Sequence, residues 1–367
     1  MNETDIRYMR VALSLGARGL GQVWPNPAVG CVIVKDGRIV GRGWTAPGGR
    51  PHAETRALEQ AGGEAKGADV YVTLEPCAHH GQTPPCADAL VAAGVARVVV
   101  AMQDPDPRVS GKGLGRLRVA GIEVVEGVLG EAAGAMQQGF VSRVTRGRPM
   151  VTLKFAASLD GRIATATGES KWITGPEARR LVHAMRARHD AVMVGGGTAR
   201  LDDPSLTVRD LGHVRQPVRV VWSRHLDVPL TGQLARTAKD VPLWLVHGED
   251  ANPDLISAWA GLGARLFACP VGTGRQIKPE SALQALGQAG LTRVFCEGGG
   301  ALAASLLAAE LVDELILFNA GLAIGAEGQP MLGALGLDRL ADASRFNLME
   351  HRAIGPDIMS RWVCRPG

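Results

Sequence analysis

The sequence predicts a two-domain α/β protein. Its 367 residues exceed the roughly 100–200 residues of one typical domain. Short apolar runs alternate with helical segments along the chain, and this alternation is typical of a sheet covered by helices. The alternation begins again after Arg146-Gly147-Arg148-Pro149, a charged stretch with Gly and Pro that suits a linker. We therefore expect one domain over residues 1–147 and another over residues 148–367.

The first half contains the elements of a small sheet. A helix over residues 6–16 leads to the turn Pro25-Asn26-Pro27. Two strand-like runs flank Asp36-Gly37, which favours a β-hairpin. The elements expected after the turn are strands 29–34 and 38–43, helix 52–61, strand 70–74, helix 87–93 and strands 97–102 and 121–125.

The second half repeats this pattern with two glycine runs. Strand 191–194 leads into Gly195-Gly196-Gly197, and strand 293–296 leads into Gly298-Gly299-Gly300 and a helix over 301–309. The other expected elements are strand 150–156, the turn Asp160-Gly161, helix 176–188 and strands 218–222, 243–247 and 315–319.

The composition excludes several classes of protein. Hydrophobic residues make up 46% and charged residues 21%, as in soluble globular proteins. Aromatic residues are only 4%, the net charge is +4, and no run of five basic residues occurs, so a nucleic-acid-binding surface is not indicated. No apolar run approaches the roughly 18–20 residues that span a bilayer, and the first ten residues are too polar for a signal peptide. We expect a cytoplasmic protein with neither a membrane nor a nucleic acid as partner.

One histidine and two cysteines indicate a zinc site. His52-Ala53-Glu54 opens a helix, Cys77 follows a strand, and Cys86 comes nine residues later. One imidazole and two thiolates suit zinc and leave a fourth position for water. Zinc lowers the pKa of that water to about 7. Glu54 can move the water's proton without being a ligand, which is the chemistry of nucleobase deaminases.

The cysteine spacing leaves another interpretation open. Eight residues separate Cys77 from Cys86, whereas the deaminase signature P-C-x-x-C has two. His79 or His80 could complete a closed structural zinc site, or the two thiols could be unrelated. The adjacent Glu54 and the strand–loop–helix order favour catalytic zinc.

The glycine runs indicate a phosphate-bearing cofactor. Glycines let a backbone approach a phosphate, and a helix N-terminus favours negative charge, although each run could also be an ordinary tight turn. Glu297 lies at the end of a strand, where ligands of α/β proteins bind. No G-x-G-x-x-G with a later acidic residue follows a strand, so the site is not the usual dinucleotide fold. Arginines such as Arg186 and Arg209 could bind an anionic substrate.

Long motifs in both halves carry a resemblance to a known family. The first half contains P-N-P-A-V-G-C-V-I-V at 25–34, H-A-E at 52–54, and Y-V-T-L-E-P-C-A-H-H-G at 71–81 followed by T-P-P-C at 83–86. The second half contains K-F-A-A-S-L-D-G at 154–161, G-E-S-K-W-I-T at 168–174, D-D-P-S-L-T-V-R at 202–209 and C-E-G-G at 296–299. These motifs resemble the bifunctional deaminase–reductases of riboflavin biosynthesis, in which the long cysteine spacing is the norm.

The resemblance implies a fold and a two-step reaction. It implies a cytidine-deaminase-like N-terminal domain and a dihydrofolate-reductase-like C-terminal domain. The first domain would hydrolytically deaminate 2,5-diamino-6-ribosylamino-4(3H)-pyrimidinone 5′-phosphate. The second would use NADPH to reduce the ribosyl chain, which gives 5-amino-6-ribitylaminouracil 5′-phosphate. The partner would be this phosphorylated pyrimidine, and the chain would form a homo-oligomer.

The resemblance also assigns roles to residues. Zinc would be held by His52, Cys77 and Cys86, with Glu54 as the catalytic residue. The residues that match NADPH contacts are Ala156, Trp172, Thr198, Asp202, Ser223, Gly299 and Gly300. Those that match substrate contacts are Ser170, Arg186, Leu206, Arg209 and Glu297. Asp202 is also a candidate for proton transfer in the reductase.

Two positions depart from the family pattern. Gln82 stands where a Lys or Arg is usual, so a contact to the substrate phosphate is in doubt. Trp222 precedes Ser223 where an Asp is usual, so the cofactor role of Ser223 is in doubt.

Two other classes compete with this interpretation. A nucleic-acid deaminase would share the His-Ala-Glu and Pro-Cys motifs, but the modest charge, the few aromatic residues and the second domain disfavour it. A non-catalytic interaction protein is disfavoured by the complete set of three ligands and Glu54.

Overall fold

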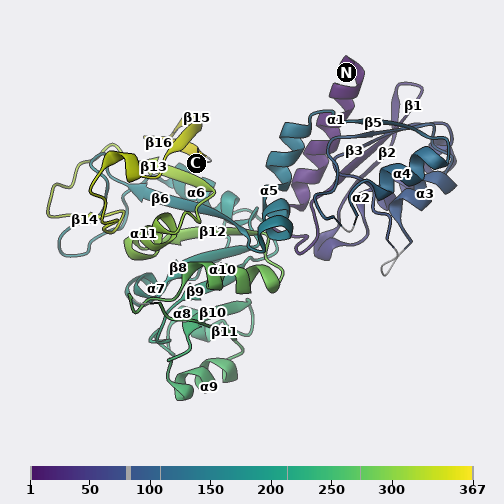
Figure 1. The fold of residues 1–367 in the computed structure, drawn as a ribbon. Coiled ribbons are helices and arrows are strands. Elements are labelled where there is room, and N and C mark those ends of the chain that lie inside the picture. The colour runs from purple at the N-terminus through teal and green to yellow at the C-terminus, as the bar shows by residue number, and fades with distance from the viewer. Residues whose placement is uncertain (1, 80–83, 108, 213, 273, 366–367) are drawn as a thin grey trace. The chain divides into compact units, whose positions relative to one another are not determined.

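The chain forms two compact units, Met1–Gly147 and Arg148–Gly367. The computed structural model describes residues 2–79, 84–107, 109–212, 214–272 and 274–365 (Figure 1). Each unit contains its own sheet, which confirms the predicted α/β class. No helix in these described ranges is long and apolar enough to cross a membrane.

The first unit is a five-stranded sheet in the order β2-β1-β3-β4-β5. Its strands are β1 (Gly30–Lys35), β2 (Arg38–Trp44), β3 (Asp69–Val72), β4 (Arg97–Val100) and β5 (Glu123–Glu126). Its helices are α1 (Glu3–Gly16), α2 (Ala53–Ala61), α3 (Cys86–Ala92), α4 (Lys112–Val119) and α5 (Gly130–Arg146). Strands β3, β4 and β5 are parallel, whereas β1 pairs antiparallel with β2 and β3.

Alternating side chains of β1 build the two cores of this unit. Cys31 and Ile33 pack in a buried cluster with α2, α3 and α4. Val32 and Val34 pack in a second cluster with α1. Successive side chains of a strand point to opposite faces, so one apolar strand supplies both helical layers.

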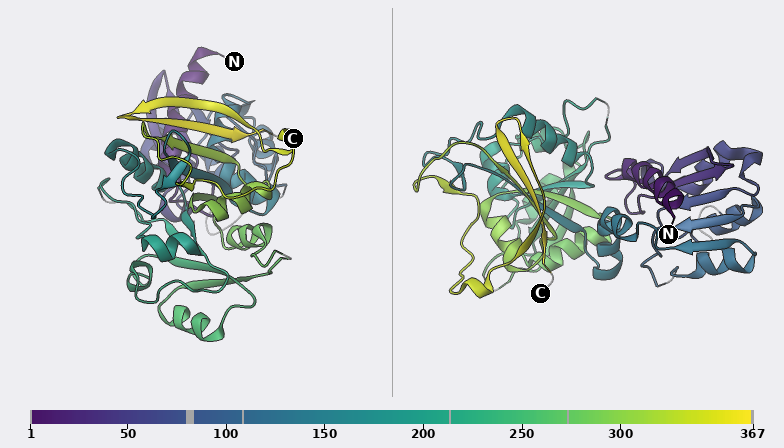
Figure 2. Two further views of the ribbon diagram at one scale, coloured as in Figure 1. Left: turned by 90° about the vertical axis from the view of Figure 1, so that its left-hand side faces the viewer. Right: turned by 90° about the horizontal axis from the view of Figure 1, so that it is seen from above.

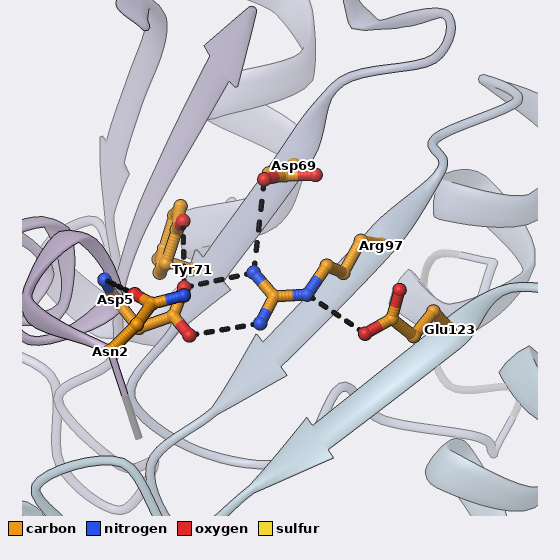
Figure 3. A network of polar contacts seen from close by, with 6 residues as sticks. All are labelled: Asn2, Asp5, Asp69, Tyr71, Arg97 and Glu123. Carbon is orange, nitrogen blue, oxygen red and sulfur yellow. Dashed lines mark hydrogen bonds and ion pairs between the residues drawn. The ribbon is translucent and has the colours of Figure 1, made fainter.

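A partly buried ion pair fixes the start of α1 to the sheet (Figure 3). The Asp5 carboxylate accepts from the Arg97 guanidinium at 2.8 and 2.9 Å and from the Tyr71 hydroxyl at 3.0 Å. The hydrogen bond from Arg97 holds the pKa of Asp5 below its usual value. The Asn2 side chain caps the helix by accepting from the Asp5 N–H at 2.7 Å.

The second unit is built on a nine-stranded sheet in the order β11-β10-β9-β8-β12-β6-β13-β16-β15. Its strands are β6 (Met150–Ala157), β8 (Ala191–Gly195), β9 (Val218–Trp222), β10 (Leu243–Gly248), β11 (Arg265–Cys269), β12 (Arg293–Gly298), β13 (Glu314–Asn319), β15 (Phe346–Ile354) and β16 (Asp357–Cys364). Neighbouring strands are parallel from β11 to β13. The hairpin β15–β16 is antiparallel and lies at the sheet edge (Figure 2). A separate pair is formed by β7 (Arg162–Ala164) and β14 (Gln329–Pro330).

The helices of the second unit include several that the sequence did not indicate. They are α6 (Pro176–Arg186), α7 (Gly196–Asp202), α8 (Gln233–Arg236), α9 (Pro253–Gly261), α10 (Pro279–Gln288) and α11 (Gly300–Ala308). Helix α7 was not expected from the sequence; Gly195 ends β8 and is the N-cap of α7, which begins at Gly196. Gly299 caps α11 in the same way.

Candidate metal centre and reductase site

Three metal-ligating side chains converge at one end of the small sheet. His52 is the N-cap of α2, Cys86 is the first residue of α3, and Cys77 lies in the segment after β3. The His52 Nδ1 atom is 3.3 Å from the Cys86 Sγ atom and 3.7 Å from the Cys77 Sγ atom. All three ligand atoms lie within 4.8 Å of one another. The fold therefore brings together the three residues that the sequence singled out.

The spacing of these atoms fits zinc. Tetrahedral zinc, with Zn–N near 2.0–2.1 Å and Zn–S near 2.3 Å, places nitrogen and sulfur about 3.5 Å apart. The observed separations of 3.3 and 3.7 Å bracket that value. Within the described residues the group has three members, and His79 is an exposed residue outside it. Three ligands leave one position open, as in catalytic rather than structural zinc sites. His80 and Gln82 lie outside the described residues.

The surroundings of Cys77 favour its thiolate. Its sulfur accepts from the Cys86 thiol, from His52, and from the Cys86 backbone N–H at 3.3 Å. These contacts lower the pKa of Cys77 to about 4. The thiolate is the form that binds a metal.

Glu54 is positioned to exchange protons near neutral pH. Its side chain is buried in the first turn of α2, two residues after His52. Burial is the main cause that raises the pKa of Glu54 to about 7, and the charge of Cys77 acts in the same direction. A carboxyl group with this pKa can both accept and donate a proton at physiological pH. The buried thiol of Cys31 lies near enough for the Glu54 charge to raise its pKa, after burial as the larger cause.

A buried carboxylate that the sequence analysis missed supports the Cys77 segment. Glu75 accepts from the backbone N–H groups of Asp104, Gly111 and Gly113 at 3.2, 3.0 and 2.8 Å. A Cβ atom on Gly113 would come within 2.0 Å of the Pro76 carbonyl oxygen. The first turn of α4 therefore packs directly on Pro76, the residue before Cys77. The signal available in the sequence was an acidic residue directly after the expected apolar strand 70–74.

The second site lies where β8, β9 and β12 end side by side. A Cβ atom on Gly299 would come within 3.0 Å of the Thr198 Oγ1 atom, and one on Gly196 within 2.9 Å of the Ser223 Oγ atom. Gly299 also has a φ of 88°, which favours glycine. Thr198, Ser223 and the two glycine segments therefore form one cluster. It lies at the carboxyl ends of parallel strands, where α/β proteins bind ligands.

A buried ion pair joins two predicted substrate residues. Arg186 on α6 pairs with Glu297 on β12 through both carboxylate oxygens, one of them at 2.9 Å. Arg186 also donates to the Thr207 carbonyl oxygen at 2.8 Å, which ties the segment before Arg209 to the pair. Burial opposes the ionisation of Glu297, but the charges of Arg186 and Lys154 hold its pKa below the usual value.

Two further titratable side chains lie near the Arg186–Glu297 pair, and the sequence analysis gave neither of them a role. Burial lowers the pKa of Lys154, which lies on β6 and is influenced by the Glu297 charge. His183 lies one turn before Arg186 on α6, and its Nδ1 atom accepts from the Arg209 N–H at 3.2 Å. Burial and the charges of Arg186 and Arg209 lower the pKa of His183. His183 lies three residues before Arg186 on the expected helix, a spacing that places both side chains on one helix face, and this was the signal in the sequence.

The remaining predicted residues lie in different surroundings. Leu206 is buried in the core of the second unit, so only its backbone can reach a ligand. Ala156 packs beside a cluster that includes Phe295. In the part of the chain that the structure describes, no hydrogen bond or ion pair joins Ser170, Trp172 or Asp202 to the glycine segments. The Trp172 side chain is 66% exposed, with the Arg179 guanidinium 4.5 Å from its ring centroid.

Ser223 and Trp222 are both buried at the end of β9. The Ser223 hydroxyl is buried and donates to the Asp227 carboxylate at 2.7 Å. Trp222 is the last residue of β9 and is also buried. Asp202 is exposed at the end of α7.

Comparisons with known proteins cover both units. Residues 2–102 match the family described as the cytidine and deoxycytidylate deaminase zinc-binding region, and residues 149–360 match the RibD C-terminal domain. The riboflavin biosynthesis protein RibD of Escherichia coli is 44% identical over 96% of this chain and 98% of its own length. The RibD protein of Aquifex aeolicus is 40% identical over 98% of both chains.

Solved structures agree with the sequence relatives. Acinetobacter baumannii RibD, form 1, is similar with a TM-score of 0.88 and 40% identity over 99% of both chains. A Thermotoga maritima protein is similar with a TM-score of 0.86 and 34% identity over 99% of both chains. That protein is described as a diaminohydroxyphosphoribosylaminopyrimidine deaminase and 5-amino-6-(5-phosphoribosylamino)uracil reductase.

Proposed function

Because the chain belongs to the RibD family of deaminase–reductases in riboflavin biosynthesis, we propose that its two units divide the two activities. Residues 1–147 carry the zinc deaminase and residues 148–367 carry the NADPH-dependent reductase. The observation that supports this division is the presence of a three-ligand metal cluster in the first unit and a glycine-lined strand-end site in the second. The predicted cofactors, zinc and NADPH, and the cytidine-deaminase-like and dihydrofolate-reductase-like folds are those of the family.

The proposed substrate of the first unit is 2,5-diamino-6-ribosylamino-4(3H)-pyrimidinone 5′-phosphate, in keeping with the name of the Thermotoga maritima relative. His52, Cys77 and Cys86 hold the zinc ion, which when bound supplies a nucleophile from water at neutral pH. Glu54 accepts a proton from the attacking water and delivers it to the leaving amine, because its pKa near 7 suits both transfers.

Replacing Glu54 by Gln tests this role. The Glu54→Gln variant keeps all three ligands, so it should bind zinc stoichiometrically while deamination falls by about 10⁴-fold or more. Glu59→Gln, on the exposed side of the same helix, is the matched control and should retain both properties. Near-normal turnover in the Glu54→Gln variant would refute the assignment.

In the second unit, the glycine cluster holds NADPH and the Arg186–Glu297 pair faces the substrate. Thr198, Ser223, Gly299 and Gly300 lie close enough to act together, and the exposed Trp172 ring and Asp202 carboxylate, together with Ala156, complete the proposed cofactor site. Substrate contacts come from Ser170, Arg186, Arg209, Glu297 and the backbone of Leu206. A guanidinium group binds phosphate oxygens in bidentate fashion, which suits Arg209 for the substrate phosphate.

The reduction also needs a proton. A hydride from NADPH adds to the sugar carbon, and the ring oxygen that becomes a hydroxyl group takes up one proton. Asp202 is the residue that the family resemblance suggests, but it is exposed at the end of α7. Lys154 is a stronger candidate, because burial lowers its pKa and it lies beside Glu297. We propose Lys154 as the proton donor and Asp202 as a cofactor contact.

A pair of variants separates these roles. Lys154→Met should reduce kcat for the reduction by about 10²–10⁴-fold. Asp202→Asn should mainly raise the KM for NADPH. The opposite pattern would return proton transfer to Asp202.

We also propose that the chain acts in the cytoplasm as a homo-oligomer that does not bind nucleic acid. The edge strand β15 supports an interface between copies, because Leu348, Met349 and, on β16, Ile358 are 47%, 56% and 54% exposed. Exposed apolar side chains on an edge strand favour pairing with a second chain. Light scattering of the purified chain tests this, and Met349→Lys should shift any oligomer toward the monomer.

A further inference from the structure

A cavity of about 840 Å³ lies in the first unit at the free edge of β2. It is lined by α1, β2 and α2, whereas the metal ligands lie at the start of α2 and α3 and after β3. Its size is that of small-molecule sites, which range over roughly 300–1,000 Å³. Three arginines and one tryptophan dominate the lining: Arg18, Arg42, Arg56 and Trp44.

The three guanidinium groups find no carboxylate partner in the part of the chain that the structure describes. Among the described residues, no ion pair is formed by Arg18, Arg42 or Arg56. Some other arginines of the same unit do pair with acidic residues. Arg97 pairs with Asp5 (Figure 3), and the pairs Arg116–Asp88 and Arg118–Glu126 lie elsewhere in the unit. One carboxylate, Glu59, also lines the cavity, so the four charged side chains leave an excess of positive charge. An excess of positive charge around a cavity attracts an anion.

Trp44 orders two of these groups without using up their hydrogen-bond donors. The Arg56 and Arg18 guanidinium carbons lie 4.3 and 5.0 Å from the centroid of its ring. Stacking uses the face of a guanidinium group and leaves its in-plane N–H groups available. Among the described residues, one such N–H group is engaged: Arg56 Nη1 donates to the Trp44 carbonyl oxygen at 3.1 Å. The cavity thus holds preorganised donors.

Side chains of α2 occupy backbone hydrogen-bonding groups on the free edge of β2. The Gln60 side chain accepts from the Arg42 N–H at 2.8 Å, and Arg56 occupies the Trp44 carbonyl oxygen. These contacts occupy groups that would otherwise pair with an added strand. A small anion fits the cavity better than an extended peptide.

We propose that this cavity binds a phosphorylated small molecule, at a site separate from both proposed active sites. The donors of three guanidinium groups exceed what the two oxygens of one carboxylate can accept, whereas a diphosphate offers oxygens to all three. The Gln60 amide nitrogen, whose oxygen accepts from the Arg42 N–H, adds a neutral donor to the cavity lining.

Calorimetric titration of the full zinc-loaded chain with inorganic pyrophosphate tests the proposal. The double variant Arg18→Gln/Arg42→Gln should bind pyrophosphate at least tenfold more weakly, while zinc content and deamination stay unchanged. Arg10→Gln/Arg38→Gln removes the same charge from exposed positions on α1 and β2 and should bind like the wild type. An Arg209→Ala background removes the proposed substrate-phosphate contact of the reductase, and saturating NADPH in all titrations occupies the proposed cofactor site. Uridine diphosphate in a parallel arm distinguishes a nucleotide from the bare anion.

Equal affinities for the wild type and Arg18→Gln/Arg42→Gln would overturn the proposal. An equal loss in the Arg10→Gln/Arg38→Gln control would also overturn it, since binding would then follow net charge rather than the cavity. Tighter binding of uridine diphosphate than of pyrophosphate, lost in the cavity variant alone, would identify a nucleotide as the ligand.

Discussion

The burial of Glu54 should make the stability of the zinc-free protein depend on pH in a defined way. The pKa of Glu54 is raised from 4.5 to about 7, chiefly by burial. The folded state therefore holds a proton that the unfolded state releases between these values. This stabilisation is complete below pH 4.5 and is lost as the pH rises through 7. At about 1.4 kcal/mol for each pKa unit, the loss approaches about 3.4 kcal/mol.

Comparison with Glu54→Gln isolates this effect, because other titrating groups contribute to both proteins. Between pH 5 and pH 8, the wild type should lose about 2.5 kcal/mol of unfolding free energy relative to the variant. The assay is denaturant-dependent hydrogen exchange of the α2 peptide after zinc chelation, since this peptide reports on the first unit. A free-energy difference that stays constant from pH 5 to pH 8 would show that Glu54 titrates near its ordinary value, and the proton-transfer role argued from its burial would fail.

Four other measurements test the two sites. Cys86→Ser should weaken zinc binding, measured by competition with a chelator, because a thiolate ligand is lost. The loss should exceed the roughly 10–100-fold that follows when a residue that only hydrogen-bonds to a ligand is removed. Undiminished zinc affinity would show that Cys86 is not a ligand. Arg209→Ala should raise the KM for the phosphorylated substrate and leave the KM for NADPH nearly unchanged in steady-state kinetics; the reverse would place Arg209 in the cofactor site. Glu297→Ala leaves a buried guanidinium without its partner and should destabilise the second unit by about 3–5 kcal/mol in chemical denaturation, with zinc content unaffected; a smaller loss would mean that water replaces the carboxylate. Fragments 1–147 and 148–367 should deaminate and reduce separately, and two folded but inactive fragments would show that the sites depend on each other.

The sequence determined the local elements and the chemistry of the metal site. Strands such as β8 are continuous apolar runs, and helices such as α2 have an apolar face, so both patterns can be identified in the sequence. The ligands His52 and Cys77, with Glu54 beside them, were identified because few other residue combinations suit zinc with an open position. The long family motifs supplied the activity.

The sequence signal was weaker where an element lies at an edge. The strand β15 carries exposed polar and apolar side chains without a clean alternation, so it has no strong period-2 pattern. Its place in the sheet depends on pairing with β16, which itself pairs with β13 about forty residues earlier. The helix α7 was not expected from the sequence, because it starts directly on glycines after β8 and has no side-chain cap.

Only the tertiary structure decided which polar groups share an environment. The pairing of Arg186 with Glu297, and the approach of Lys154 and His183 to that pair, join residues from three elements far apart in the chain. Glu54 owes its raised pKa to burial, which depends on how α2 packs against the sheet. The cavity around Trp44 likewise exists only because α1 and α2 meet at the edge of β2. Residue type sets what a side chain can do, but its distance from other charges and its access to water arise only when the chain folds.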